Sequence, residues 1–132
     1  MTEFFGNRNL ADAATEKLKV YAQPQRLMIL SYLLRGENTV SNIDAATGIG
    51  QPALSQQLAT LRRAELVKTR RDGKQIFYDL ADEAARLCVR TMEALLVERP
   101  DPQRILEAAA HLDPPAMTAP YTSGSAGFAK IL

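Results

Sequence analysis

The sequence has 132 residues, of which 46% are hydrophobic, so it can bury the core of one domain. Its formal net charge is only +1, which excludes a bulk polycation. The charge is uneven, however, because residues 51–80 contain six Lys or Arg against three Asp or Glu, whereas the flanking segments are neutral or acidic. A local excess of this kind is typical of a nucleic-acid-binding surface, and an ordinary fluctuation among solvated charges is the alternative.

The chain contains one cysteine, Cys88, and therefore forms no internal disulfide. A single unpaired thiol favours a reducing, cytoplasmic compartment. The N-terminus lacks the basic and then apolar pattern of a signal peptide, and no apolar run approaches the ~20 residues that span a bilayer. We therefore expect a cytoplasmic protein that does not contact a membrane.

Two helices are expected in the first third of the chain. Residues 1–8 are expected to be a flexible lead-in, and apolar residues then recur at helical spacings from Asn9 to Tyr21. Pro24 opens a second helix, which is apolar on nearly every side and ends before Gly36. A helix of this kind belongs in the middle of a core.

A short strand and a third helix follow. Residues 39–40 are expected to form a strand that pairs with a hairpin further along the chain. The third helix is expected to be capped by Ser41 or Asn42 and to turn Ile43 and Ala46 towards the core. Its role is to position the helix that comes next.

Residues 47–80 hold the most informative pattern, a fourth helix followed by a hairpin. Gly48 and Gly50 predict a turn, and Pro52 stands where the first helical residue is expected. Apolar residues recur at spacings of four and three along one side of this helix, at Leu54, Leu58 and Leu61. The opposite side and its flank are polar and end in a cation; they carry Pro52, Ser55, Gln56, Ala59, Thr60 and Arg63.

The pattern then changes to that of a β-hairpin. Strands are expected at residues 66–71 and 74–80, joined by Asp72-Gly73, a dipeptide that tolerates the positive φ angles of a two-residue turn. Basic residues flank this turn. A polar helix beside a hairpin with a basic tip is typical of a winged helix-turn-helix, in which the helix reads base edges and the wing reaches phosphates.

A long fifth helix completes the expected fold, capped by Asp82 and reaching about Glu98, with a wider apolar surface than one small core needs. Residues 99–112 are expected to form a short C-terminal helix, and residues 113–132 a disordered tail. The predicted fold is mainly α with a small β-hairpin wing, in the order α-α-α-α-β-β-α plus the short helix. Its DNA-binding and dimerisation domain is expected at residues 9–98.

The stretch QPALSQQLATLRRAELVKTRRDGKQIFYDL, which begins at Gln51, resembles the reading helix and wing of the ArsR/SmtB family of bacterial repressors. The resemblance covers roughly residues 10–98, and Glu65 stands where a glycine is common in the family. The form QPALSQQL is closest to the branch that senses redox or sulfur species. The resemblance implies a homodimer, formed through the first and fifth helices, that represses transcription at a palindromic DNA operator until a signal releases it.

The candidate DNA contacts divide into two chemical groups. Side chains that can hydrogen-bond base edges or phosphates are Gln51, Ser55, Gln56 and Thr60, with Gln56 and Ser55 the first candidates for base contacts. Cations that can neutralise phosphates are Arg63, Lys68, Arg70, Arg71 and Lys74. The alternative function is that of a winged-helix protein–protein interaction module that does not bind DNA.

The sequence offers no conventional metal site. The family's sites use a Cys-x-Cys pair near the third helix or Asp and His from the fifth, but residues 40–48 contain no cysteine and residues 82–98 no histidine. The only histidine, His111, stands near a helix end, where a surface residue is more common than a ligand. We therefore expect no metal and no cofactor.

The redox branch of the family uses two thiols in each subunit, one on the second helix and one on the fifth. Ser31 stands at the first of these positions, so the resemblance excludes a disulfide within a subunit. Cys88 is then either a redox-active thiol or a small buried hydrophobe. Three alternatives remain for the signal that releases DNA: a small molecule, a thiol oxidant that acts at Cys88, or no signal at all.

Enzymatic activity is not expected. The sequence has no glycine-rich phosphate loop. Its single histidine offers no Ser/His/Asp or Cys/His set for nucleophilic catalysis. Paired carboxylates in a plausible cleft are also lacking. The predicted function is therefore regulation through DNA binding.

Overall fold

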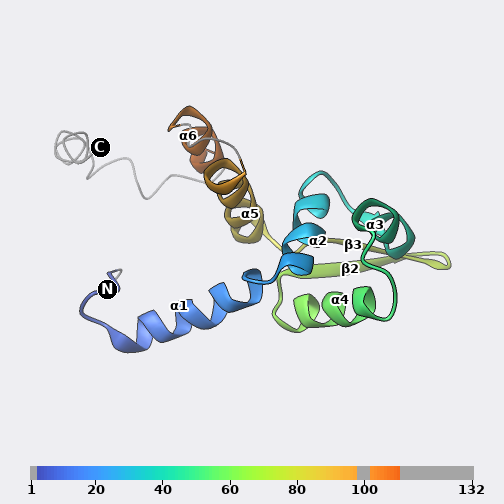
Figure 1. Cartoon of the computed structure of the whole chain (residues 1–132), viewed down its shortest axis with the longest axis horizontal. Coiled ribbons are helices and arrows are strands. Elements are labelled where there is room, and N and C mark those ends of the chain that lie inside the picture. Colours follow the sequence, from blue (N-terminus) through green and yellow to red (C-terminus); the bar gives the residue numbers. More distant parts are fainter. Residues whose placement is uncertain (1–2, 98–101, 111–132) are drawn as a thin grey trace.

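The structure, a computed structural model, describes residues 3–97 and 102–110 as a mainly helical fold with a small antiparallel sheet (Figure 1). The elements, in chain order, are α1 (Arg8–Tyr21), α2 (Pro24–Leu34), β1 (Asn38–Thr39), α3 (Val40–Thr47), α4 (Ala53–Arg63), β2 (Val67–Asp72), β3 (Gln75–Leu80), α5 (Glu83–Leu96) and α6 (Pro102–Ala110). The sheet has the order β1-β3-β2. The predicted fold class, a winged helix-turn-helix with β2 and β3 as the wing, is confirmed.

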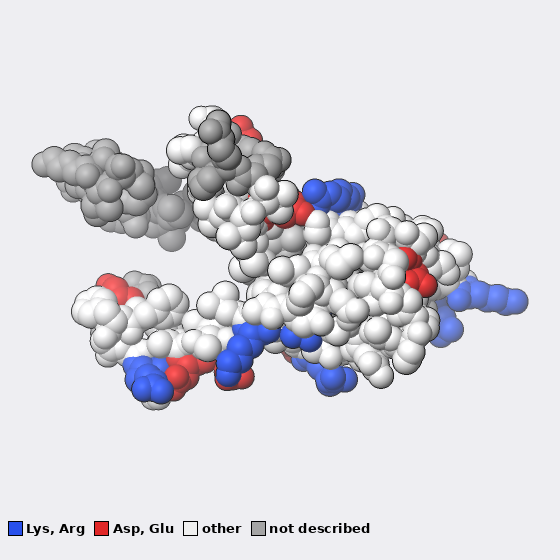
Figure 2. All heavy atoms as spheres, in the orientation of Figure 1, with Lys and Arg blue, Asp and Glu red and all other residues white. Residues whose placement is uncertain are grey.

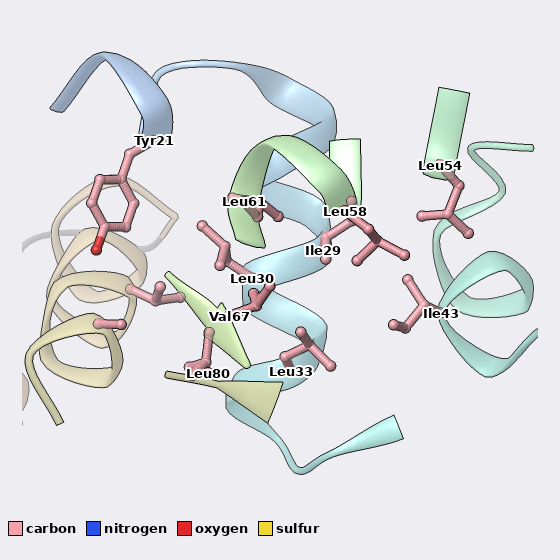
Figure 3. Close-up of a cluster of buried hydrophobic side chains, with 12 residues drawn as sticks. Tyr21, Ile29, Leu30, Leu33, Ile43, Leu54, Leu58, Leu61, Val67 and Leu80 are labelled. Atoms are coloured by element: carbon pink, nitrogen blue, oxygen red, sulfur yellow. The ribbon is translucent and has the colours of Figure 1, made fainter. Parts of the chain in front are cut away.

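Helix α2 forms the centre of the core. Ile29, Leu30 and Leu33 are fully buried, because α2 is apolar on nearly every side and other elements pack around it. Figure 3 shows the side chains that gather around this helix from α1, α3, α4 and the two wing strands, namely Tyr21, Ile43, Leu54, Leu58, Leu61, Val67 and Leu80. The central place expected for the second helix is confirmed.

Side-chain caps fix where the first two helices begin. Asn7 Oδ1 accepts the backbone N–H of Leu10 at 3.0 Å, and such a cap stabilises a helix start by about 1 kcal/mol. Helix α1 therefore begins at Arg8, one residue earlier than expected and inside the expected lead-in of residues 1–8. The side chain of Gln23 caps α2 in the same way.

Helix α3 begins earlier than the sequence predicts. Thr39 Oγ1 accepts the backbone N–H of Asn42 at 3.3 Å, so Thr39 is the cap, and the expected caps, Ser41 and Asn42, are wrong. Because the cap stands at Thr39, Val40 belongs to the helix and not to the strand before it. Ala46 is exposed rather than turned to the core, because the last turn of α3 lies at the surface.

The wing has a register that differs by one residue from the prediction. Asp72 pairs with Gln75, so the two-residue turn is Gly73-Lys74 and not Asp72-Gly73. Gly73 has φ +63°, and glycine at the first of the two turn positions is what a type II′ hairpin turn requires. Strand β1 pairs only with the middle of β3, so the outer half of the wing has two strands.

Helices α1, α5 and α6 project from the body on the side away from the wing tip (Figure 1). They carry large apolar side chains that remain exposed, among them Leu18, Leu95, Leu96 and Leu106. Within the described ranges, every helix is too short or too polar to cross a bilayer. The projecting helices thus present an apolar surface that one chain leaves uncovered.

The ends of the last two helices depart slightly from expectation. Asp82 Oδ1 accepts the backbone N–H of Ala85 at 2.9 Å and caps α5, as the sequence predicts. Helix α5 ends at Leu96, and the expected end at Glu98 lies outside the described residues, as does the expected tail of residues 113–132. Helix α6 lies within the segment for which a short helix is expected.

Helix α4 ends in a Schellman motif at the position where the resembling family commonly has a glycine. The N–H of Leu66 donates to the carbonyl of Leu61 and that of Glu65 to the carbonyl of Arg62, both at 3.0 Å. Glu65 has φ +61°, the only positive φ among the described non-glycine residues. The motif requires this left-handed conformation, which is costly for a residue that has a Cβ atom.

Glu65→Gly is expected to raise the free energy of unfolding by about 1 kcal/mol. The left-handed conformation costs an L-residue roughly 1–2 kcal/mol, and the larger conformational entropy of glycine in the unfolded chain offsets part of the gain. Urea unfolding at a fixed protomer concentration measures the difference. The matched control is Glu65→Ala, which removes the same charge but keeps the Cβ; an equal gain in both variants would assign the effect to the charge.

Candidate nucleic-acid interface

One aspartate holds the turn that sets the angle between α3 and α4. Gly48 and Gly50 have φ angles of +68° and +81°, which glycine adopts at little cost. The carbonyl oxygen of Asp44 accepts the N–H of Gly48 at 2.7 Å, and its Oδ1 accepts the N–H of Gly50 at 2.8 Å. The start of α4 is thereby fixed relative to α3.

Gln51 completes the start of α4. Pro52, expected at the first helical position, is instead the N-cap residue and supplies no capping side chain. Gln51 Oε1 takes this part, because it accepts the backbone N–H of Ser55 at 3.1 Å and the Ser55 hydroxyl at 2.7 Å. Two of the candidate DNA contacts, Gln51 and Ser55, are therefore hydrogen-bonded to each other. Gln51 caps the start of α4.

The outward face of α4 presents Gln56, Thr60 and Arg63. Three buried leucines anchor the opposite face, so the polar face is turned to the surface. Thr60 Oγ1 donates to the carbonyl of Gln56 at 3.1 Å and accepts from Arg63 Nη2 at 3.3 Å. The exposed side-chain amide of Gln56 makes no hydrogen bond within the part of the chain that the structure describes, so it is well placed to meet a base edge.

A hollow of about 390 Å³ lies between α4 and the wing. It is lined by Val40, Ser55, Leu58, Ala59, Arg62, Arg63 and Tyr78. Neither Arg62 nor Tyr78 is among the contacts predicted from the sequence, although Arg62 follows Ser55 by seven residues, which is about two helical turns. The guanidinium groups of Arg62 and Arg63 and the hydroxyl of Tyr78 beside this hollow can donate hydrogen bonds, which suits phosphate oxygens.

The two faces of the wing differ in their surroundings. Side chains alternate along a strand, so Arg71 shares the face of Thr69, which lies opposite Tyr78 at the border of the hollow. Lys68 and Arg70 belong to the other face. The four wing cations expected from the sequence are therefore not brought together on one side.

The tip of the wing is basic. Arg71 lies near the turn and Lys74 within it, both exposed, and Figure 2 shows basic side chains that extend from the end of the wing beyond the rest of the molecule. A wing tip in this place can contact the backbone beside the groove that holds the reading helix.

Arg70 is bound to another side chain of the protein. Its guanidinium meets both carboxylate oxygens of Glu37 at 2.5–3.0 Å and lies 4.5 Å from the ring centroid of Phe77. The hydrogen bonds from Arg70 lower the pKa of the Glu37 carboxyl, and the same bonds raise the pKa of the guanidinium. A phosphate would have to compete with this carboxylate for Arg70.

Helix α4 is also tied to the end of α1. Arg26 Nη1 donates to Gln57 Oε1 at 3.1 Å, while Arg26 Nε donates to the carbonyl of Val20 at 2.6 Å. Gln57 Nε2 in turn donates to Gln25 Oε1 at 3.2 Å. One arginine of α2 therefore contacts both the projecting α1 helix and α4.

Cys88 lies on α5, beside the hydroxyl of Tyr21. It is exposed in the single chain and shares the uncovered surface of α5 with Leu95, so it is not buried within one subunit. Burial raises the pKa of Tyr21, and Cys88 and Asp82 raise it further. Across the described ranges, no three His, Cys, Asp or Glu side chains gather as metal ligands, and His111 lies outside those ranges.

Known proteins are similar to this chain in sequence and in fold. The chain matches the family described as "Bacterial regulatory protein, arsR family" over residues 23–69. It is 55% identical over 71 residues to the biofilm growth-associated repressor of Agrobacterium fabrum, a match that covers 53% of this chain and 61% of that protein. The chain therefore spans about three fifths of the length of that relative.

Solved structures give longer matches. The crystal structure of the transcriptional repressor BigR from Xylella fastidiosa is similar with a TM-score of 0.63 and 39% identity, over 68% of this chain and 89% of that one. A homodimeric winged helix-turn-helix DNA-binding domain from Mycobacterium bovis is similar with a TM-score of 0.62 and 29% identity, over 74% and 90% of the two chains.

Arg70→Ala is expected to return the pKa of Glu37 towards that of an unperturbed glutamate, because the hydrogen bonds that favour the carboxylate are lost. Since the pKa is lowered in the folded protein, the pair stabilises the wing attachment above the ordinary glutamate pKa, and this contribution is lost as the pH falls through the lowered value. An NMR titration of the Glu37 carboxyl carbon measures the shift. Arg71→Ala, which removes a cation from the other face, is the control; an unchanged Glu37 midpoint in Arg70→Ala would contradict the assignment.

Proposed function

Because the chain belongs to the ArsR family of bacterial regulatory proteins, we propose that it is a transcriptional repressor that binds a palindromic DNA operator as a homodimer. The observation that carries the proposal is the exposed polar face of α4 beside a basic wing tip. In a winged helix-turn-helix, this face enters the major groove and the wing contacts the backbone. The similar repressors from Agrobacterium and Xylella support the repressing role.

In the proposed complex, α4 reads bases and the wing tip binds the backbone. The base-reading side chains are Gln56, Ser55 and Thr60; an exposed amide such as that of Gln56 can donate to and accept from an adenine edge. The phosphate-binding cations are Arg62, Arg63, Arg71 and Lys74. Gln51 supports the complex as the cap of α4, while Lys68 and Arg70 face away from the hollow.

A second copy of the chain supplies the two-fold symmetry that a palindrome requires. The proposed interface is formed by α1 and α5, where Leu18 is 60% and Leu96 75% exposed in the single chain. Exposed apolar patches of this kind mark interaction surfaces. The homodimeric domain from Mycobacterium supports this assembly, which would set the two α4 helices about one turn of DNA apart.

The remaining parts of the proposal concern organisation and control. Residues 9–98 form the DNA-binding and dimerisation unit, which acts in the cytoplasm as a regulator rather than an enzyme. A signal that alters the arrangement of the two subunits releases DNA through the coupling free energy between the two sites. A small molecule and an oxidant that acts at the exposed Cys88 are the alternative signals.

Fluorescence anisotropy on DNA from upstream of the protein's own gene tests the proposal. The dimer is expected to prefer this duplex to a shuffled one and to bind less tightly as salt rises, because phosphate contacts release counterions. Gln56→Ala should cost about 1–3 kcal/mol on the operator and much less on the shuffled duplex. The matched control is Gln75→Ala, an exposed glutamine of the wing, which should cost little on either duplex.

Two other outcomes have distinct meanings. Equal losses on both duplexes would make Gln56 a positioning residue and not a base contact. Binding that is weak at low salt, indifferent to salt and no stronger for duplex DNA would favour the protein–protein interaction module instead.

Leu96→Glu is expected to convert the dimer into monomers, because it places an unpaired charge in the proposed apolar interface. Sedimentation equilibrium measures the mass in solution. Ile76→Glu makes the same kind of change on the exposed wing, remote from α1 and α5, and should leave the protein dimeric. A Leu96→Glu protein that stays dimeric would place the interface elsewhere.

A further inference from the structure

A salt bridge braces the wing. Arg70 Nε donates to both carboxylate oxygens of Glu37, at 3.0 and 2.9 Å, and Arg70 Nη2 donates to Oε1 at 2.5 Å. The guanidinium also lies over the ring of Phe77, 4.5 Å from its centroid. The contact therefore uses both features that distinguish arginine from lysine, the donor fork and the flat face.

The salt bridge stands where the third strand ends. Glu37 lies 33 residues before Arg70, in the link between α2 and β1, where Gly36 turns the chain with φ +145°. Phe77 is the residue nearest the tip that pairs with β1, through Thr39. Beyond this pair the wing is a ribbon of two strands, an arrangement that is at best marginally stable alone. The brace is thus at the base of the unsupported part of the wing.

Arg70 faces away from the hollow beside α4. It lies opposite Phe77 in the hairpin, whereas its neighbours Thr69 and Arg71 share the other face with Tyr78. The Arg70 side chain is 51% exposed, so the ion pair contributes little to global stability. Its effect is local to the wing.

We propose that Glu37 and Arg70 are wing-positioning residues, whose ion pair holds the outer wing at the angle that brings Arg71 and Lys74 to the DNA backbone, while Arg70 itself contacts no phosphate. The proposal rests on the DNA binding proposed above and adds the role of Glu37. A carboxylate near phosphates repels them, so an acidic residue at the base of a basic wing weakens DNA binding unless it also makes an interaction that favours binding. The ion pair with Arg70 is that interaction.

Reciprocal charge exchange tests the brace. The variants are Arg70→Glu, Glu37→Arg and the double variant with both changes, which keeps the net charge of the wild type. Hydrogen exchange of the amides between residues 71 and 76, measured without DNA, reports the opening of the outer wing. Exchange should be several-fold faster in Arg70→Glu and return to the wild-type rate in the double variant. Circular dichroism checks that each variant is folded. All variants should fold, because the ion pair is half-exposed and contributes little to global stability.

Operator affinity over a series of salt concentrations tests the consequence for DNA. Arg70→Glu is expected to weaken binding roughly tenfold, and the double variant to recover to within about threefold of the wild type with an unchanged salt slope. The matched control is Arg71→Glu, which Glu37→Arg should not rescue because Arg71 lies on the other face. A phosphate contact by Arg70 would instead lower the slope by about 1 in both variants that carry Glu at this position.

The outcomes separate this inference from the proposed function. A double variant that recovers neither wing protection nor affinity would overturn the positioning role. Recovery of protection without recovery of affinity would make Arg70 a phosphate contact and would also overturn it. A wild-type protein that does not bind the operator would overturn the proposed function and the DNA part of this inference. Hydrogen exchange, measured without DNA, would still test whether the ion pair stabilises the outer wing.

Discussion

The burial of α2 is the constraint on which the rest of the structure depends. Its apolar surface extends around most of the helix, so α3, α4, α5 and the sheet all pack against it. Ile29, Leu30 and Leu33 have no exposed surface, and truncation of such a side chain typically costs about 2–5 kcal/mol. Because α4 and the wing rest on the same helix, their relative position is a property of the core, and the hollow between them follows from it.

Two polar links connect this core to the projecting helices. Arg26 joins the end of α1 to Gln57 of α4. On the other side, the Ser31 hydroxyl donates to Glu93 of α5, and Arg35 donates to both oxygens of the same carboxylate at 2.9 and 3.1 Å. At the position where the redox-sensing branch has a thiol, this chain therefore has a hydroxyl bonded to α5. In the proposed dimer, both links run from an interface helix to the DNA-binding unit, as a coupling between sites requires.

Features set by hydrophobic periodicity or by a residue's known capping preference could be predicted from the sequence, whereas the hydrogen-bond partner of a particular polar side chain, near or distant in the chain, could not. The leucine stripe of α4 and the Asp82 cap of α5 each lie within one or two helical turns, and the structure has both. Polarity alone assigns Gln51 and Arg70 to DNA, but the folded chain offers competitors for each. The start of α4 takes the amide oxygen of Gln51, and Glu37, 33 residues away, takes the guanidinium of Arg70. Hydrophobic periodicity carries no information about either competitor.

The fold also decides what the local basic excess means. By strand alternation the two acidic residues of the wing, Asp72 and Asp79, lie on the same face as Arg70, away from the hollow. Opposite charges are paired on that face, since Asp79 binds Arg86 at 3.0 Å just as Glu37 binds Arg70. The face towards α4 keeps Arg71 without a carboxylate from either wing strand. The modest excess of positive charge in the sequence is therefore concentrated on one face of the folded wing. Because the electrostatic field at a surface depends on where the charges lie, a chain that is nearly neutral overall has one basic side.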